Sequence, residues 1–153
     1  MKIEANQTLD IKKLISFKKV STASALQSHI EALLAYIDAC GAKKIGGMIS
    51  ATYAHEGDAL SVEIYMPIDK EIPSTDEFIY KPQLILVNCI RGKHKGNPQM
   101  IETTMKKLSD YIVCNALTPI SVGFSVTITE ITSMAELDFF ETDVYISINP
   151  NIF

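Results

Sequence analysis

The sequence predicts an α+β protein built from two copies of a strand-helix-strand-strand unit. The units are expected to form one antiparallel sheet with two helices on one face and a concave pocket on the other. Three observations lead to this prediction. A gapless shift of 75 residues places residues 22–52 on residues 97–127. Both stretches carry apolar residues at helical spacing, and both are followed by segments with the alternation of strands.

The first strand of each copy and the helix after it come first in the chain. The strands are expected over residues 11–20 and 83–91, and the helices near residues 22–40 and 97–115. Each helix shows an apolar stripe spaced i, i+4, i+7 and i+11, which is one face of an α-helix. The stripes consist of Leu26, Ile30, Leu33 and Ile37 in the first copy and of Ile101, Met105, Leu108 and Ile112 in the second.

Polar residues and a glycine mark the expected ends of the helices. Thr22 is a suitable N-cap for the first helix, and Asn97 followed by Pro98 is suitable for the second. Gly41 predicts a left-handed residue at the end of the first helix, since glycine adopts that conformation without a steric penalty. Asn115 is expected to do the same for the second helix.

Two more strands follow each helix. They are expected over residues 45–53 and 60–68 in the first copy and over residues 120–131 and 139–148 in the second. The last strands match at an offset of 80 residues, so the second hairpin carries a five-residue insertion around residues 132–136.

The chain of 153 residues suits one domain with a substantial core. We expect a single domain over residues 1–153, with repeat one over about 9–69 and repeat two over about 83–150. The segment between them, residues 69–82, contains two prolines and several charges and is expected to be a linker.

Composition narrows the location. The hydrophobic fraction of 47% and the charged fraction of 21% are typical of a globular protein. No apolar run approaches the roughly 18–20 residues that cross a bilayer. The N-terminal residues are polar and lack the apolar core of a signal peptide. We therefore expect a cytoplasmic protein without membrane association. No helix-turn-helix segment flanks the two copies, so a one-chain transcription regulator is not expected.

Charge and motifs argue against several classes of partner. The net charge is −4, and the densest basic stretch, residues 91–96, is short and broken by glycines. We expect that stretch to be a solvated loop and expect no nucleic-acid partner, because such binding needs a clustered basic face. Phosphate-binding and dinucleotide-binding motifs are absent from the sequence. Cys40, Cys89 and Cys114 lack paired metal spacing. Neither a metal nor a cofactor is expected.

The last strand of each copy has the most informative alternation. Side chains alternate between the two faces of a strand, so Glu63 and Tyr65 share one face, as do Asp143 and Tyr145. The aliphatic residues between them are expected to pack under the helices. These four residues, together with Tyr53, are the candidate ligand-binding residues. The alternative interpretation is a half-exposed strand whose acids and tyrosines face water.

The chain resembles the GyrI-like superfamily in several short motifs. In the second copy these are Arg91, the segment His-Lys-Gly-Asn-Pro over residues 94–98, the helix with Tyr111, and Pro119. In the first copy the motif is Glu-Ile-Tyr-Met-Pro over residues 63–67. The superfamily includes effector-binding domains of multidrug-responsive regulators, gyrase-inhibitory proteins and SOUL-type haem-associated proteins.

The resemblance implies the same duplicated fold and a pocket acid in the last strand. That acid falls on Asp143, with Glu63 as its pseudo-symmetric partner. The sequence departs from the family pattern at two of these positions. Asp143 stands where the family usually has Glu, and Ser147 stands where it usually has Pro.

The leading hypothesis is a stand-alone, non-enzymatic protein that binds an amphipathic or cationic small molecule. One alternative is a hydrolase that acts on reactive electrophilic small molecules with pocket carboxylates and a tyrosine. Another is a protein-protein interaction module, either gyrase-inhibitor-like or associated with a secretion system. An enzyme would turn over its ligand, whereas a binding protein would hold it stoichiometrically. The sequence leaves open a homodimer and a protein partner.

Overall fold

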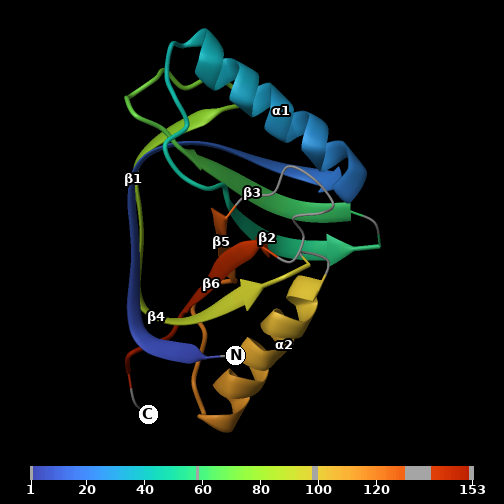
Figure 1. Cartoon of the computed structure of the whole chain (residues 1–153), viewed down its shortest axis with the longest axis vertical. Helices are drawn as coiled ribbons and strands as arrows, with labels where there is room; N and C mark the ends of the chain where they lie inside the picture. The colour runs from blue at the N-terminus through green and yellow to red at the C-terminus, as the bar shows by residue number, and fades with distance from the viewer. Residues whose placement is uncertain (1, 58, 98–99, 130–138, 152–153) are drawn as a thin grey trace. The chain divides into compact units, whose positions relative to one another are not determined.

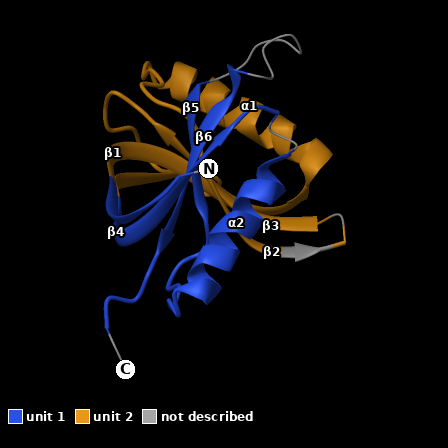
Figure 2. Ribbon diagram, turned by 60° about the horizontal axis from the view of Figure 1, so that its bottom comes forward, with its two compact units in different colours: residues 1–9, 85–153 blue, residues 10–84 orange. Residues whose placement is uncertain are grey.

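The computed structural model describes residues 2–57, 59–97, 100–129 and 139–151. The chain divides into two compact units, which Figure 2 shows in different colours. Unit 2 consists of residues 10–84, and unit 1 consists of residues 1–9 and 85–153. Antiparallel strands and two helices make up the structure, so the predicted α+β class is confirmed.

Unit 2 has a three-stranded antiparallel sheet and one helix (Figure 1). Its central strand is β3 (Ala59–Pro67), which pairs with β1 (Ile3–Thr22) on one side and with β2 (Ile49–Glu56) on the other. Helix α1 (Ala23–Ala39) connects β1 to β2. The side chain of Thr22 accepts a hydrogen bond from the backbone N–H of Ala25 at 3.2 Å, so the predicted N-cap is confirmed.

The core of unit 2 forms between α1 and the aliphatic face of β3. Leu33 and Ile37 are the buried residues of the helix, and they belong to one cluster with Ile64, Met66 and Ile68. Removing one such side chain from water contributes about 1.5–3 kcal/mol. The aliphatic residues of this strand therefore pack under the helix as predicted, and the opposite face of the strand is left for Glu63 and Tyr65.

Unit 1 repeats this arrangement with β6 (Glu141–Ser147) as its central strand. β6 pairs with β4 (Ile79–Lys95) and with β5 (Phe124–Thr129), and α2 (Ile101–Cys114) connects β4 to β5. Leu108 of α2 is fully buried in a cluster with Val144 and Ile146. A Cβ atom at Gly92 would lie 3.0 Å from the Leu108 side chain, so this glycine allows the helix to approach β4 closely.

The strand registers of the two units correspond. Lys18 pairs with Glu63 in unit 2, and Lys93 pairs with Asp143 in unit 1. Both second hairpins also contain a register shift, between Thr52 and Ala54 and between Thr127 and Thr129. The lysine pairs and the shifts repeat the offset of 75 residues, while the carboxylates repeat the offset of 80. The insertion predicted around residues 132–136 lies outside the described residues.

Several local predictions are wrong. Residues 91–95 are part of β4 and not a loop, because they pair with β6 in a regular ladder. β1 begins at Ile3, and β4 begins at Ile79 inside the expected linker. Helix α2 begins at Ile101 with Met100 at its N-cap position, where no side chain caps the helix. The carbonyl of Asn97 instead accepts a bond from the His94 ring at 2.9 Å, which fixes Asn97 before the helix.

The end of α2 also differs from the prediction. Asn115 keeps a negative φ of −103°, and its side-chain amide donates to the carbonyl of Tyr111. The left-handed residue is Ala116, with φ of +52°. It matches Gly41, whose φ is +72°, at the offset of 75. Alanine has a steric penalty in this conformation of roughly 1–2 kcal/mol, which glycine avoids.

We expect Ala116→Gly to raise the free energy of unfolding by about 0.5–1 kcal/mol, because relief of the left-handed strain exceeds the added flexibility of the unfolded chain. Gly41→Ala should lower it by about 1 kcal/mol. Urea unfolding measures both changes. Ala35→Gly, on the exposed side of α1, is the control and should destabilise by about 1 kcal/mol. A destabilised Ala116→Gly variant would contradict this account of the helix end.

Candidate functional site

The polar face of unit 2 has one carboxylate at its centre. Glu63 Oε1 accepts hydrogen bonds from the hydroxyls of Tyr65, at 2.5 Å, and Tyr53, at 3.2 Å. Its other oxygen, Oε2, accepts a bond from Lys81 Nζ at 3.0 Å. The Glu63 side chain is 12% exposed, so these three donors replace most of the water that would otherwise solvate the charge.

Two lysine ammonium groups lie over the tyrosine rings of this cluster. Lys81 Nζ is 5.0 Å from the centroid of the Tyr65 ring, and Lys18 Nζ is 4.5 Å from the centroid of the Tyr53 ring. Both distances are within the range of a cation–π interaction. We call Tyr53, Glu63, Tyr65, Lys18 and Lys81 the Glu63 cluster. It combines one carboxylate, two aromatic rings and two ammonium groups.

The local structure explains how these side chains meet. Glu63 stands between Lys18 of β1 and Ala51 of β2 in the antiparallel register. Tyr53 occupies the irregular position of β2, because Thr52 pairs with Val62 and Ala54 pairs with Ser61. Such an extra residue bends a strand and redirects its side chains. The β2 tyrosine thereby reaches the carboxylate of the neighbouring strand.

Electrostatics fix the protonation states in this cluster. Burial by itself would raise the pKa of Glu63, but hydrogen bonds from Tyr65, Lys81 and Tyr53 and the positive charge of Lys81 outweigh it and lower the pKa. Burial raises the pKa of Tyr65 far above its usual range, and the bond to Glu63 raises it further. Glu63 is therefore ionised near neutral pH, and Tyr65 remains a protonated donor.

The corresponding face of unit 1 carries Asp143 and Tyr145. Asp143 is 7% exposed, and its Oδ1 atom makes no hydrogen bond among the described residues. Lys93 Nζ lies 4.0 Å from that atom, which is close enough for an ion pair but too long for a hydrogen bond. Tyr145 is hydrogen-bonded to Arg91. The acid of unit 1 is thus less completely paired than Glu63.

Basic and acidic side chains alternate around Asp143. Arg91 Nη2 binds Glu4 at 2.5 Å, and Glu141 lies 3.5 Å from Lys93 and 3.6 Å from Lys95. A small pocket of about 350 Å³ is formed by five residues of this region, namely Lys2, Glu4, Arg91, Lys93 and Lys95. These partly exposed pairs contribute little to stability individually, since water screens them.

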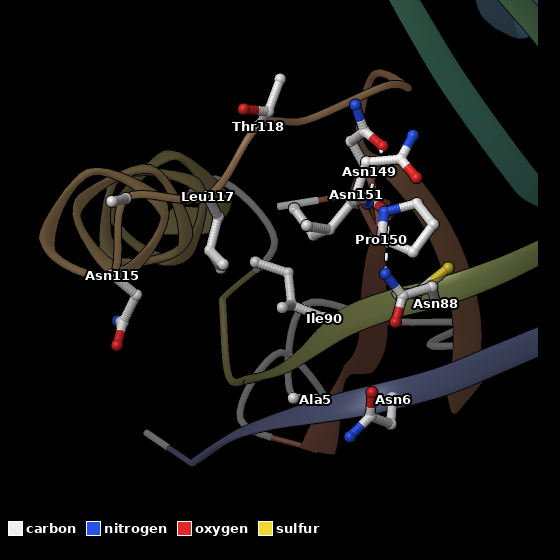
Figure 3. A pocket seen from close by; sticks show the side chains of 13 residues that line it. Ala5, Asn6, Asn88, Ile90, Asn115, Leu117, Thr118, Asn149, Pro150 and Asn151 are labelled. Atoms are coloured by element: carbon white, nitrogen blue, oxygen red, sulfur yellow. Dashed lines mark hydrogen bonds between the residues drawn. The ribbon is translucent and has the colours of Figure 1, made fainter. Parts of the chain in front are cut away.

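The largest pocket of unit 1, about 640 Å³, contains none of the predicted site residues (Figure 3). It lies where α2 ends, beside β4 and the residues that follow β6. Five asparagines line it, at positions 6, 88, 115, 149 and 151. The sequence contained a signal for this pocket, the asparagines around residues 149–151, which the strand and helix patterns gave no reason to select.

The structure brings three of the five predicted residues, Tyr53, Glu63 and Tyr65, into direct contact. Asp143 and Tyr145 share one face of β6 in unit 1, and a cleft common to all five remains a prediction. Sequence reasoning missed Lys18 and Lys81. Lys18 would follow from the strand register, whereas Lys81 lies in the segment expected to be a linker.

Comparison with known proteins was informative only at the level of structure. No protein-family model matches the sequence, and no curated protein matches it either. Among solved structures, the EcmrR C-terminal domain superposes with a TM-score of 0.74 at 13% identity, covering 97% of this chain and 99% of that one. The chain has the fold of the EcmrR C-terminal domain.

Other solved structures share this fold. The EcmrR chain in a complex with DNA gives a TM-score of 0.75 at 11% identity, with 95% of this chain covered, and this chain spans 57% of its length. A hydrolase from Listeria innocua gives 0.62 at 9% identity, covering 94% of this chain and 91% of that one. SAV2435 bound to tetraphenylphosphonium gives 0.54 at 12% identity, covering 97% and 93%. Identities this low establish the fold alone.

Neither helix in the described part of the chain is both long and apolar enough to cross a membrane.

The paired state of Glu63 predicts a pH dependence of stability. Its pKa in the folded protein lies below the ordinary value of 4.5, so the ionised group stabilises the fold above that pH, and this contribution is lost as the pH falls through the lowered pKa. We expect Glu63→Gln to be less stable than the wild type at about pH 7, and the difference to shrink toward about pH 3. Urea unfolding at both pH values measures it.

Lys81→Met provides the control for this experiment. Without the ammonium group the pKa of Glu63 is lowered less, so adding Glu63→Gln to the Lys81→Met variant should change the pH dependence only slightly. A constant difference between wild type and Glu63→Gln across the pH range would contradict the assigned pairing.

Proposed function

We propose that this chain is a stand-alone small-molecule-binding protein of the GyrI-like effector-binding type. In this proposal, the Glu63 cluster recognises flat, lipophilic cations. The observation that carries the proposal is the placement of Lys81, whose ammonium group lies at once on Glu63 Oε2 and over the ring of Tyr65. This part of unit 2 already holds a cation between a carboxylate and an aromatic face.

The energetics favour a cationic ligand over a neutral or anionic one. A largely buried carboxylate is stable only with donors or positive charge beside it. A ligand cation that displaces Lys81 keeps Glu63 paired, and the rings of Tyr53 and Tyr65 add about 0.5–2 kcal/mol each through cation–π contact. The displaced Lys81 side chain is already 35% exposed, so it moves into water at little cost. An anion would meet the charge of Glu63 without compensation.

The structural comparisons support a small-molecule role in the same way. SAV2435, which has this fold, was solved bound to tetraphenylphosphonium, a bulky aromatic cation. In unit 1, Asp143 is the second acid of the proposal, because its buried Oδ1 atom has no hydrogen-bond donor among the described residues. A donor on a ligand would satisfy it. The proposal includes a cytoplasmic location and no nucleic-acid partner.

An enzymatic role is the second candidate, and one of the solved structures with this fold is a hydrolase. Catalysis would require Glu63 to activate water and Tyr65 to act as an acid. The raised pKa of Tyr65 disfavours a tyrosinate nucleophile. Incubation of a stoichiometric amount of protein with a reactive ester separates the two functions, because only an enzyme would convert several equivalents.

The carboxylate is tested by Glu63→Gln, which keeps the shape of the side chain and removes its charge. A fluorescence titration with a cationic dye and an anionic dye of similar shape measures the preference. We expect the wild type to bind the cationic dye more tightly, and Glu63→Gln to lose about tenfold or more in that affinity, since a hydrogen bond to a charged group contributes about 1.5–3 kcal/mol. Asp143→Asn should lose less. Equal affinities for the two dyes in the wild type would refute the proposal.

The role of Lys81 gives an independent prediction. If its ammonium group occupies the position of the ligand cation, Lys81→Met should bind tetraphenylphosphonium several-fold more tightly than the wild type, because the competing internal cation is gone. Isothermal titration calorimetry measures this affinity. Lys106→Met, an exposed lysine on α2, removes the same charge elsewhere and should leave the affinity unchanged. Weaker binding by Lys81→Met would show that the lysine contributes to the site directly.

A further inference from the structure

The pocket at the end of α2 has a lining of a different chemical kind. It is formed by residues of unit 1 alone, with a volume of about 640 Å³, which suits a drug-sized ligand. None of its lining residues is acidic or basic. Its polar side chains are Thr118 and five asparagines, and its larger apolar side chains are Ile90, Leu117, Ile148 and Pro150. A charged ligand would lose its hydration here without meeting an opposite charge.

Hydrogen bonds hold three of the asparagine side chains in fixed orientations. The Nδ2 groups of Asn88 and Asn115 donate to the backbone carbonyls of Ile148 and Tyr111, each at 2.8 Å. Asn149 Oδ1 accepts from the backbone N–H of Asn151 at 3.0 Å. Anchoring one end of an amide leaves its other end for a ligand. The pocket wall therefore carries carbonyl oxygens from Asn88 and Asn115 as acceptors and the amino group of Asn149 as a donor.

Figure 3 shows how the polar and apolar side chains are distributed in this view. Asn6, Asn88, Asn149 and Asn151 stand along one side, and the aliphatic side chains of Ile90 and Leu117 stand along the other. Asn6, Asn88 and Ala116 also have positive φ angles, of +56°, +54° and +52°. Backbone conformations of this kind cluster at binding sites.

Unit 2 provides an internal comparison, because its backbone follows the same course at the matching positions. The N–H of Ile68 donates to the carbonyl of Lys13, as that of Ile148 does to Asn88. The N–H of Asp69 donates to the carbonyl of Lys43, as that of Asn149 does to Thr118. Lys13 even has the same left-handed conformation as Asn88, with φ of +59°.

The residues of unit 2 at these positions are charged. Lys13 matches Asn88, Lys43 matches Thr118, and Asp69 and Glu71 match Asn149 and Asn151. Charged side chains thus support the same backbone hydrogen bonds, and the fold does not require asparagine there. The uncharged lining of the unit 1 pocket therefore calls for a reason other than folding.

We propose that this pocket is a second binding site, which takes an uncharged ligand with amide or hydroxyl groups along one edge and an apolar face. The polar edge bonds to the amides of Asn88 and Asn149, and the apolar face packs on Ile90 and Leu117. The selectivity is opposite to that of the Glu63 cluster, because fixed amide dipoles replace the charges of that cluster.

Three probes of nearly identical shape test this site: benzamide, benzoate and benzamidinium. They carry a neutral, a negative and a positive group on the same ring. Side-chain amide signals of the asparagines in an ¹⁵N-labelled protein report binding by nuclear magnetic resonance. We expect benzamide to shift the signals of Asn88 and Asn149 and to bind at least about tenfold more tightly than either ion. Equal affinities for the three probes, or no shift of these signals with benzamide, would overturn the proposal.

The variant Asn149→Asp sharpens the test, and unit 2 already carries aspartate at the matching position, so the backbone tolerates it. The retained oxygen still accepts from Asn151, while the donor becomes a carboxylate oxygen. Benzamide affinity should fall about tenfold, and benzamidinium should become the preferred probe. Asp69→Asn in unit 2 is the control and should leave the preference for benzamide intact. An unchanged preference for benzamide in Asn149→Asp would also overturn the proposal.

Discussion

The two central strands, β3 and β6, each have an aliphatic face and a polar face, and the candidate sites on them depend on this alternation. Leu33 and Leu108 of the helices cover the aliphatic faces, which supplies the hydrophobic driving force of each unit. That packing fixes the strand register, because a slip of one residue would turn the aliphatic side chains outward. Glu63 and Asp143 are thereby held on the opposite faces at low exposure.

Partial burial of a carboxylate imposes the next constraint, and the two units meet it differently. Glu63 is surrounded by two hydroxyl donors and one ammonium group, and its pKa is lowered despite its burial. Asp143 has the cross-strand lysine but no hydrogen bond to Oδ1 among the described residues. Since the aspartate arm is one methylene shorter, it does not reach the same kind of partners. The two acids therefore differ in the ligand group that would satisfy them.

The correspondence between the units also separates what the fold needs from what it permits. Matching backbone hydrogen bonds occur with lysine and aspartate in unit 2 and with asparagine and threonine in unit 1. Left-handed residues recur at Gly41 and Ala116 although only one of them is glycine. Backbone geometry is thus conserved between the units while the side chains vary, so that one architecture carries a charged cluster in unit 2 and an uncharged pocket in unit 1.

The sequence by itself determined the α+β class, both helices, the Thr22 cap and the two faces of each last strand, because these features follow from local periodicity and capping chemistry. It also pointed to Tyr53, Glu63 and Tyr65. Only the tertiary structure placed Lys81 on Glu63, moved the end of α2 to Ala116 and brought residues from four segments together around the asparagine-lined pocket. These features depend on strand register and on contacts between residues far apart in the chain, and neither is encoded in the spacing of neighbouring side chains.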